Sequence, residues 1–326
     1  MNVTVLGAGA WGTALARLLH QNGHAVTLWG HDAGHLDEVR RSGQNECYLP
    51  GIKISPGLKF ESDLPRAIAG AECVVVAVPS KAFREVAGWL RNFNGVAVSV
   101  TKGIEHDTGL TMSGILAETA PKSKPTALSG PTFALEVAKE IPTAIVAASR
   151  DPAAATTVQQ IFHRPTFRVY TSADLVGVEL GGALKNVIAI AAGICDGVGF
   201  GHNSKAALVT RAISEIRRLG VACGAQVDTF TGLSGLGDLM VTCFSKLSRN
   251  RAFGERVARG EKPADIAAKS LAIAEGYPTA KSAHRLAQRH KIETPIIDEV
   301  HAMLYENKSV KQALQDLMAR ESKAED

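Results

Sequence analysis

Apolar residues follow two different periods along the chain. Continuous β-branched runs at 73–78 and 96–100 are typical of strands buried on both faces of a parallel sheet. Further strands are expected at 2–6, 25–29, 126–129, 143–148 and 167–170, with helices between them. From about Leu175 helical periods take over, in segments at 175–194, 203–222, 250–260, 263–273, 279–290 and 295–320. The pattern predicts a mainly parallel sheet domain over residues 1–176, an all-α domain over residues 177–326, and a substrate cleft between them.

A glycine-rich turn joins the first expected strand to the first helix, with the sequence Gly7-Ala8-Gly9-Ala10-Trp11-Gly12. Gly7 permits a tight turn, Gly9 lets backbone amides approach a phosphate, and Gly12 lets helix and strand pack closely. A pyrophosphate would then lie at the helix N-terminus. A glycine triplet alone is weak evidence for nucleotide binding, and the alternative is a glycine-rich turn in an ordinary α/β domain. Because this triplet lies between a strand and a helix, the sequence predicts a Rossmann-type dinucleotide-binding domain of the α/β class.

The tip of the second strand bears on the choice of coenzyme. NAD sites usually place a carboxylate there for the ribose 2′-hydroxyl, whereas NADP sites offer basic or neutral groups. Here Trp29, Gly30 and His31 occupy the tip, and Asp32 lies just beyond it. The sequence is therefore compatible with NADP and leaves NAD open.

The amino-acid composition indicates which kinds of molecule the protein binds. The 36 basic and 32 acidic residues are too evenly balanced for sequence-independent nucleic-acid binding, and anionic small molecules fit better. The five cysteines are scattered singly, so neither a disulfide framework nor a metal site is predicted. Every candidate apolar run is interrupted before the ~20 residues of a membrane helix, and the apolar start lacks a basic n-region. We expect a soluble, cytoplasmic protein.

One helical segment, 178–193, is apolar almost all round and is interrupted by Lys185 and Asn186. Burial can lower the pKa of a lysine by up to ~3–5 units unless a carboxylate opposes the shift. Such a lysine can accept a proton near neutral pH. The alternative is a lysine whose ammonium reaches the surface along an apolar stem.

Two further clusters carry polar groups that suit a phosphorylated ligand. Three glycines precede Asp238 in the segment 231–242, which suggests backbone held close to a ligand and a carboxylate placed to accept from a lysine or a substrate hydroxyl. Ser248, Arg249 and Asn250 offer a hydroxyl, a guanidinium fork and an amide. A flexible turn with a helix-capping aspartate and a solvated basic loop are the respective alternatives.

A turn after the strand at 126–129 begins with Gly130 and Pro131. It is expected to lead into a helix capped by Thr132, with Glu136 near the capping-box spacing. The turn either positions a ligand or only starts the helix.

Taken together, these motifs resemble, along nearly the whole chain, bacterial NAD(P)-dependent glycerol-3-phosphate dehydrogenases. Six blocks in the same order are far more specific than any one of them. The blocks are Gly7–Ala14, Val100–Glu105, Ser129–Ala134, Glu179–Asn186, Gly235–Leu239 and Ser248–Asn250.

The resemblance implies a role for each matching residue. Lys185 falls on the catalytic proton acceptor, assisted by Asp238. Residues that would bind glycerol phosphate are Lys102, Gly130, Thr132, Asp238, Ser248, Arg249 and Asn250. Residues that would bind the nucleotide are Gly7, Gly9, Ala10, Trp11, Gly12, His31, Lys102, Ala134, Arg249 and Glu275. Ala10 and Thr132 stand where relatives often carry Ser. Thr132 keeps the hydroxyl group, whereas Ala10 has none to offer a ligand.

The resemblance further implies NADP or NAD as coenzyme, a homodimer, and a supply of glycerol 3-phosphate for phospholipid biosynthesis. One competing interpretation is another dehydrogenase of the same build, of the β-hydroxyacid or 6-phosphogluconate type. A second is a nucleotide-sensing protein without catalysis, in which Lys185 is structural. Substrate profiling separates these interpretations.

Overall fold

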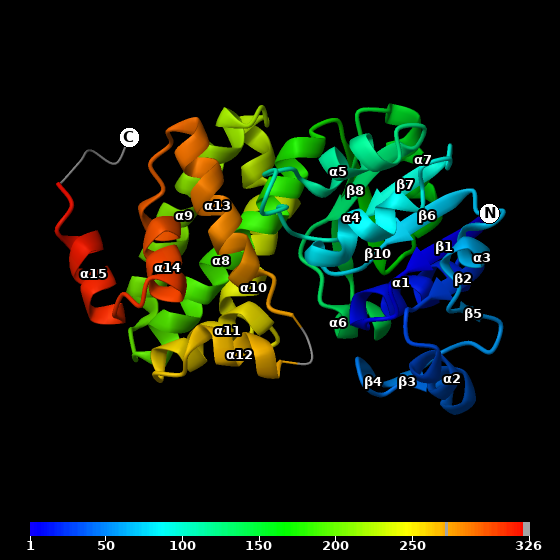
Figure 1. The fold of residues 1–326 in the computed structure, drawn as a ribbon, viewed down its shortest axis with the longest axis horizontal. Helices are drawn as coiled ribbons and strands as arrows, with labels where there is room; N and C mark the ends of the chain where they lie inside the picture. The colour runs from blue at the N-terminus through cyan, green and yellow to red at the C-terminus, as the bar shows by residue number, and fades with distance from the viewer. Residues whose placement is uncertain (271–272, 322–326) are drawn as a thin grey trace.

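A computed structural model describes residues 1–270 and 273–321 and places a twisted sheet beside a bundle of helices (Figure 1). The eight-stranded sheet has the order β10-β9-β8-β7-β6-β1-β2-β5, and only the β8–β9 pair is antiparallel. Its strands are β1 (Asn2–Leu6), β2 (Ala25–Trp29), β5 (Lys59–Glu61), β6 (Cys73–Val76), β7 (Val96–Ser99), β8 (Lys124–Ser129), β9 (Thr143–Ala148) and β10 (Phe167–Ser172). All seven strands expected from the sequence form, and the mainly parallel sheet is confirmed.

Helices cover both faces of the sheet, which explains the continuous apolar runs. In β6, Val75 packs in one core cluster with Leu15 of α1, whereas Val74 and Val76 pack in another with Phe83 of α4. Successive side chains of a strand point to opposite faces, so each face needs its own apolar set. The helices of this half are α1 (Ala10–Gln21), α2 (Ala33–Ser42), α3 (Leu64–Ile68), α4 (Ser80–Gly88), α5 (Met112–Thr119), α6 (Ala134–Ala138) and α7 (Pro152–Phe162). A small hairpin of β3 (Gln44–Asn45) and β4 (Leu49–Lys53) lies outside the main sheet.

The helical half is built around α8 (Leu175–Gly197), in which every residue from Val178 to Ile194 is buried. Figure 1 shows α8 among the other helices of this half. These are α9 (His202–Ala222), α10 (Asp238–Phe244), α11 (Arg249–Ala258), α12 (Pro263–Lys269), α13 (Gly276–His290), α14 (Pro295–Tyr305) and α15 (Val310–Met318). In the described part of the chain α8 alone has the length and hydropathy of a membrane span, but its apolar window is 94% buried inside the protein. It is the core helix of this half.

Two expectations about helices were wrong. The segment 295–320 is two helices, because Asn307 adopts a left-handed conformation (φ 59°) and Ser309 caps α15 by accepting the N–H of Gln312. Thr132 does not cap α6, which begins one residue later, after Phe133. Its hydroxyl instead donates to Gly130 O at 3.1 Å within the turn. Of the helix expected at 263–273, positions 271–272 lie outside the described residues.

Two glycines allow α8 and α11 to cross at backbone contact. A Cβ at Gly193 would collide with the carbonyl of Arg251, and a Cβ at Gly254 would collide with the carbonyl of Ile190. No flexible side chain can yield at either point. This crossing fixes the start of α11, which carries Arg249, relative to α8, which carries Lys185.

We expect Gly254→Ala to lower the free energy of unfolding by about 3 kcal/mol, because the added methyl group overpacks two helix backbones. Chemical denaturation measures the loss. Gly88→Ala is the matched control: Gly88 is exposed, ends α4, and has open space around its Cβ position. The control is expected to stay within about 1 kcal/mol of the unsubstituted protein. Equal losses in the two variants would contradict this account of the crossing.

Candidate active site

Lys185 is buried on α8, with its side chain 8% exposed. Its ammonium donates to Asp238 Oδ1 at 2.7 Å and to Thr242 Oγ1 at 2.6 Å. Burial lowers the pKa of Lys185 to about 8, the carboxylate of Asp238 opposes the shift, and nearby Lys102 adds to it. The lysine therefore lies inside the protein with its partners and does not reach out to bulk solvent.

Asp238 is held by a tightly packed turn. A single π-helical turn, Leu233–Gly237, leads directly into α10, whose first residue is Asp238. A Cβ at Gly235 would collide with the backbone of Phe230, and a Cβ at Gly181 would lie 2.7 Å from Ser234 O. At Gly235 the space is therefore taken by protein backbone, whereas the sequence suggested a ligand there.

Lys102 brings a second ammonium from the sheet half. It follows β7 and donates to Asp238 Oδ2 at 2.6 Å and to Gly130 O at 2.9 Å. One buried carboxylate thus bridges two ammonium groups, one from each half of the chain. Because Asp238 balances only one of them, a protonated pair leaves positive charge at the junction, which favours an anionic ligand.

A chain of amides connects this cluster to the starts of α11 and α13. Asn186 donates to Lys102 O at 3.3 Å, and its own oxygen accepts from Asn250 Nδ2 at 2.9 Å. Asn250 Oδ1 accepts the N–H of Gly276 at 2.9 Å. Asn250 is therefore engaged within the protein by both polar atoms, which limits its contact with a ligand to its second N–H.

Ser248 and Arg249 begin α11. Ser248 is the N-cap and accepts the N–H of Arg251 at 3.2 Å. Arg249 is exposed to solvent, but it is also close to many protein atoms. Their desolvation of the guanidinium lowers the pKa of Arg249, and the carboxylate of Glu275 opposes this shift. No described residue forms a salt bridge with Arg249, so its guanidinium fork is available to an anion.

The glycine turn after β1 fits a dinucleotide pyrophosphate. Gly7 has φ +123°, and a Cβ there would lie 2.5 Å from Ala77 O. Around the Cβ position of Gly9 there is open space, and α1 has no side-chain cap and no acidic residue in its first turn, where Ala10, Trp11 and Gly12 lie. Free N–H groups at a helix N-terminus facing open space favour a phosphate.

The remaining nucleotide candidates are spread along the same edge of the sheet. His31 is exposed just beyond β2, and Ala134 starts α6. Glu275 precedes α13 and accepts from Ser80, at the start of α4. The structure thus joins Lys102, Asp238 and Lys185 directly, and no described contact links His31 to them.

Thr242 and Ser80 were not among the site residues expected from the sequence. Thr242 lies four residues after Asp238, so recognising a helix at 238–244 would have placed both on one face toward Lys185. The position of Ser80 after the strand at 73–78 placed it at an end of the sheet expected to face the cofactor, but its partner Glu275 could not be foreseen from 195 residues away.

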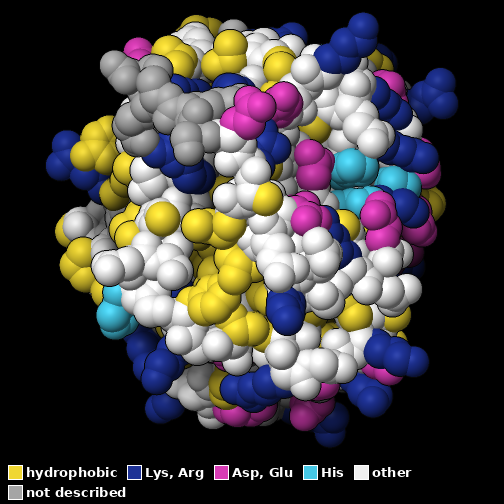
Figure 2. All heavy atoms as spheres, turned by 90° about the vertical axis from the view of Figure 1, so that its left-hand side faces the viewer, with side chains coloured by type: hydrophobic (Ala, Val, Ile, Leu, Met, Phe, Trp, Pro, Cys, Tyr) yellow, Lys and Arg dark blue, Asp and Glu magenta, His cyan; other side chains and the backbone are white. Residues whose placement is uncertain are grey.

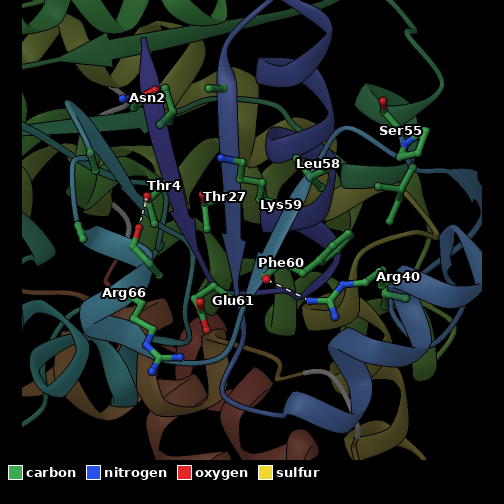
Figure 3. A pocket seen from close by; sticks show the side chains of 18 of the residues that line it. Asn2, Thr4, Thr27, Arg40, Ser55, Leu58, Lys59, Phe60, Glu61 and Arg66 are labelled. Carbon is green, nitrogen blue, oxygen red and sulfur yellow. Dashed lines mark hydrogen bonds between the residues drawn. The ribbon is translucent and has the colours of Figure 1, made fainter.

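The cavity shown in Figure 3, about 1020 Å³ in volume, lies elsewhere. It surrounds β5 and the start of β1, and no candidate site residue lines it. Lys59 and Phe60 point to opposite faces of β5 because strand side chains alternate, and Arg40 packs over Phe60 at 5.8 Å. Lys59 therefore lies on the face of β5 opposite to Phe60, over which Arg40 packs.

Fold and site together define an NAD(P)-dependent oxidoreductase with a Rossmann domain followed by a helical domain. Models of the N- and C-terminal domains of NAD-dependent glycerol-3-phosphate dehydrogenase match residues 2–155 and 174–315. The chain belongs to this family.

Individual relatives match this chain along nearly their whole length. A Syntrophotalea carbinolica protein named glycerol-3-phosphate dehydrogenase (NAD(P)+) is 50% identical, over 100% of this chain and 99% of its own. A Geobacter sulfurreducens protein of the same name is 48% identical, over 99% of this chain and 98% of its own. The crystal structure of glycerol-3-phosphate dehydrogenase from Coxiella burnetii superposes with a TM-score of 0.94 at 37% identity, covering 98% of this chain and 99% of that one.

Proposed function

We propose that this protein catalyses reversible hydride transfer between sn-glycerol 3-phosphate and dihydroxyacetone phosphate with NADP or NAD. The observation that carries the proposal is the buried Lys185–Asp238–Lys102 cluster where the dinucleotide domain meets the helical domain. The family and the names of the relatives support the same substrate pair.

Lys185 would manage the proton of this reaction. Bound NAD(P) supplies the hydride acceptor or donor. During oxidation the neutral amine of Lys185 takes the proton of the C2 hydroxyl as the C2 hydrogen leaves with its electron pair, and during reduction the ammonium returns a proton to the carbonyl oxygen. Asp238 and Thr242 hold the amine in place through their hydrogen bonds.

The phosphate group would anchor the substrate away from the reacting carbon. Arg249, for which the described part of the chain shows no salt bridge, lies at the start of α11, and Lys102 adds positive charge from the sheet side. Binding energy at the phosphate can then be used to orient C2. The turn carrying Gly130 and Thr132 lies next to Lys102 and is proposed to line the same site.

The activity is expected to depend on pH with opposite signs in the two directions. Because the pKa of Lys185 is lowered to about 8, kcat/KM for glycerol 3-phosphate oxidation should rise with pH and level off above about 8. For dihydroxyacetone phosphate reduction it should fall through the same range, since the ammonium is lost. Initial rates measured from pH 6 to 10 test this.

Asp238→Asn provides the control for the assignment of that pKa. Asp238 raises the pKa of Lys185, so removing its charge should move the midpoint of both profiles to lower pH. A midpoint that stays at its wild-type position would assign the titration to another group.

The activity itself is tested by following NADPH, and then NADH, while dihydroxyacetone phosphate is added. Oxidation of the nucleotide supports the proposal, and the ratio of rates ranks the coenzymes. Faster turnover of a β-hydroxyacid or of 6-phosphogluconate would favour another dehydrogenase of the same build. Nucleotide binding without turnover of any of these substrates would favour a sensor.

We further propose that the protein is cytoplasmic and supplies glycerol 3-phosphate for phospholipid biosynthesis. We place the boundary between its two domains at 176/177.

We also propose that the protein is a homodimer. Figure 2 shows apolar side chains gathered among charged ones on the end of the helical half. Leu314 and Met318 of α15 are among the exposed apolar residues of this half. A second copy could cover such surface. Light scattering should then give twice the chain mass of 34.4 kDa.

A further inference from the structure

One contact between the two halves has no part in the proton transfer described above. Glu275 Oε1 accepts the backbone N–H of Ser80 at 3.0 Å, and Oε2 accepts its hydroxyl at 2.6 Å. Ser80 begins α4, separated from the end of β6 by three residues, whereas Glu275 immediately precedes α13. The bidentate contact therefore fastens the helical half to the carboxyl edge of the parallel strands, where nucleotides bind in this fold.

The surrounding chain leaves room for this contact. A Cβ at Gly103 would lie 2.6 Å from Ser80 Cβ and 3.5 Å from Glu275 Oε2. Gly103 directly follows Lys102, so the contact is adjacent to the lysine that pairs with Asp238. Any larger residue at 103 would displace Ser80, whose Cβ is too close, and so disturb its contact with Glu275.

The charge of Glu275 is satisfied at this position. The first turn of α4 contains no acidic residue, so the carboxylate supplies the negative charge that a helix N-terminus favours. Burial raises the pKa of Glu275, while the bonds from Ser80 and the charge of Arg249 oppose the shift. Glu275 is thus held between Ser80 of the sheet half and the guanidinium proposed to bind phosphate.

We propose that Ser80 is a positioning residue for the coenzyme: with Glu275 it forms an interdomain clasp that fixes the nucleotide crevice. The proposal rests on the proposed function, because it takes Glu275 as a nucleotide contact. Ser80 acts through Glu275, by holding its carboxylate and the start of α13 against the sheet edge. Without the hydroxyl, one of the two bonds is lost and the crevice is held less firmly, so nucleotide binding weakens more than proton transfer does.

The test measures the Kd of NADPH and of NADH by nucleotide fluorescence, without substrate. We expect Ser80→Ala and Glu275→Gln each to weaken binding about tenfold, since each loses a hydrogen bond to a charged group. Ser80→Thr keeps the hydroxyl and should restore most of the affinity. The double variant should bind no more weakly than the weaker single variant, because both changes break the same contact. In turnover, KM for NADPH should rise more than kcat falls.

Ser149→Ala is the matched control. Ser149 is likewise a serine of the sheet half; it is buried, whereas Ser80 is half-buried, and its hydroxyl donates to Pro125 O at 2.7 Å. It follows the antiparallel β9, at the opposite edge of the sheet, so its removal should leave nucleotide affinity unchanged.

Wild-type affinity in Ser80→Ala, additive losses in the double variant, or an equal loss in Ser149→Ala would each overturn the clasp. These outcomes are independent of the proposed substrate. Failure of the proposed function would appear instead as a wild-type protein that binds NADPH and does not oxidise it with dihydroxyacetone phosphate.

Discussion

Replacing Lys185 with alanine is expected to reduce kcat by about 10²- to 10⁴-fold in both directions, the range that general acid–base help contributes. Burial lowers the pKa of the Lys185 amine to about 8, so it can exchange a proton near neutral pH, and the methyl group of alanine cannot replace it. Nucleotide affinity should persist, because the glycine turn after β1 is untouched. Steady-state kinetics and fluorescence binding measure the two effects separately.

The fold should survive this substitution. Asp238 keeps its ion pair with Lys102 at 2.6 Å, so no buried carboxylate is left alone. Lys205→Ala is a closely matched control. Lys205 is likewise a buried lysine of the helical half, and its partner Asp196 keeps an ion pair with Arg251. Near-normal turnover in Lys185→Ala, or an equal loss in Lys205→Ala, would refute the role of Lys185 as the proton acceptor.

Arg249→Ala is expected to lower kcat/KM for dihydroxyacetone phosphate by about 10²- to 10³-fold, as when one partner of a hydrogen-bonded charge pair is removed. The loss should fall on the phosphorylated substrate. With dihydroxyacetone, which has no phosphate, the variant and the unsubstituted protein should differ far less. The ratio of kcat/KM for the two substrates is therefore the measurement, and any nucleotide contact of Arg249 cancels in it.

Arg256→Ala controls for loss of a cation from the same helix. Arg256 lies seven residues after Arg249 on α11 and forms an ion pair with Glu261 at the surface. It should leave the substrate ratio unchanged. A variant Arg249→Ala that loses activity equally with both substrates would show that the guanidinium does not bind the phosphate.

Local patterns were sufficient for most of the architecture. The β-branched runs at 73–78 and 96–100 predicted buried parallel strands, and the loss of such runs after Leu175 predicted the helical half. The antiparallel direction of β9 was not predictable, because a strand buried on both faces shows the same apolar run in either direction. The break of 295–320 into α14 and α15 depends on a left-handed Asn307, which the apolar period did not reveal.

In the candidate site, too, some features followed from the sequence and others only from the structure. Burial of Lys185 followed from the sequence, since apolar residues surround it on every side of one helix. Its partners did not follow, because Asp238 is 53 residues away from Lys185 and 136 from Lys102. Thr242 was hidden until a helix placed it one turn beyond Asp238.

The sequence by itself determined the classes of structure: a strand, glycine turn and helix at the start of the chain, a mainly parallel sheet, and a helical half around an apolar segment that carries Lys185. These depend on periods and spacings within one element, where neighbours in sequence are neighbours in space. The tertiary structure alone decided that one carboxylate bridges two lysines and that Glu275 clasps Ser80. Such contacts join segments that only folding brings within hydrogen-bond distance, and no local pattern records which of the polar groups will meet.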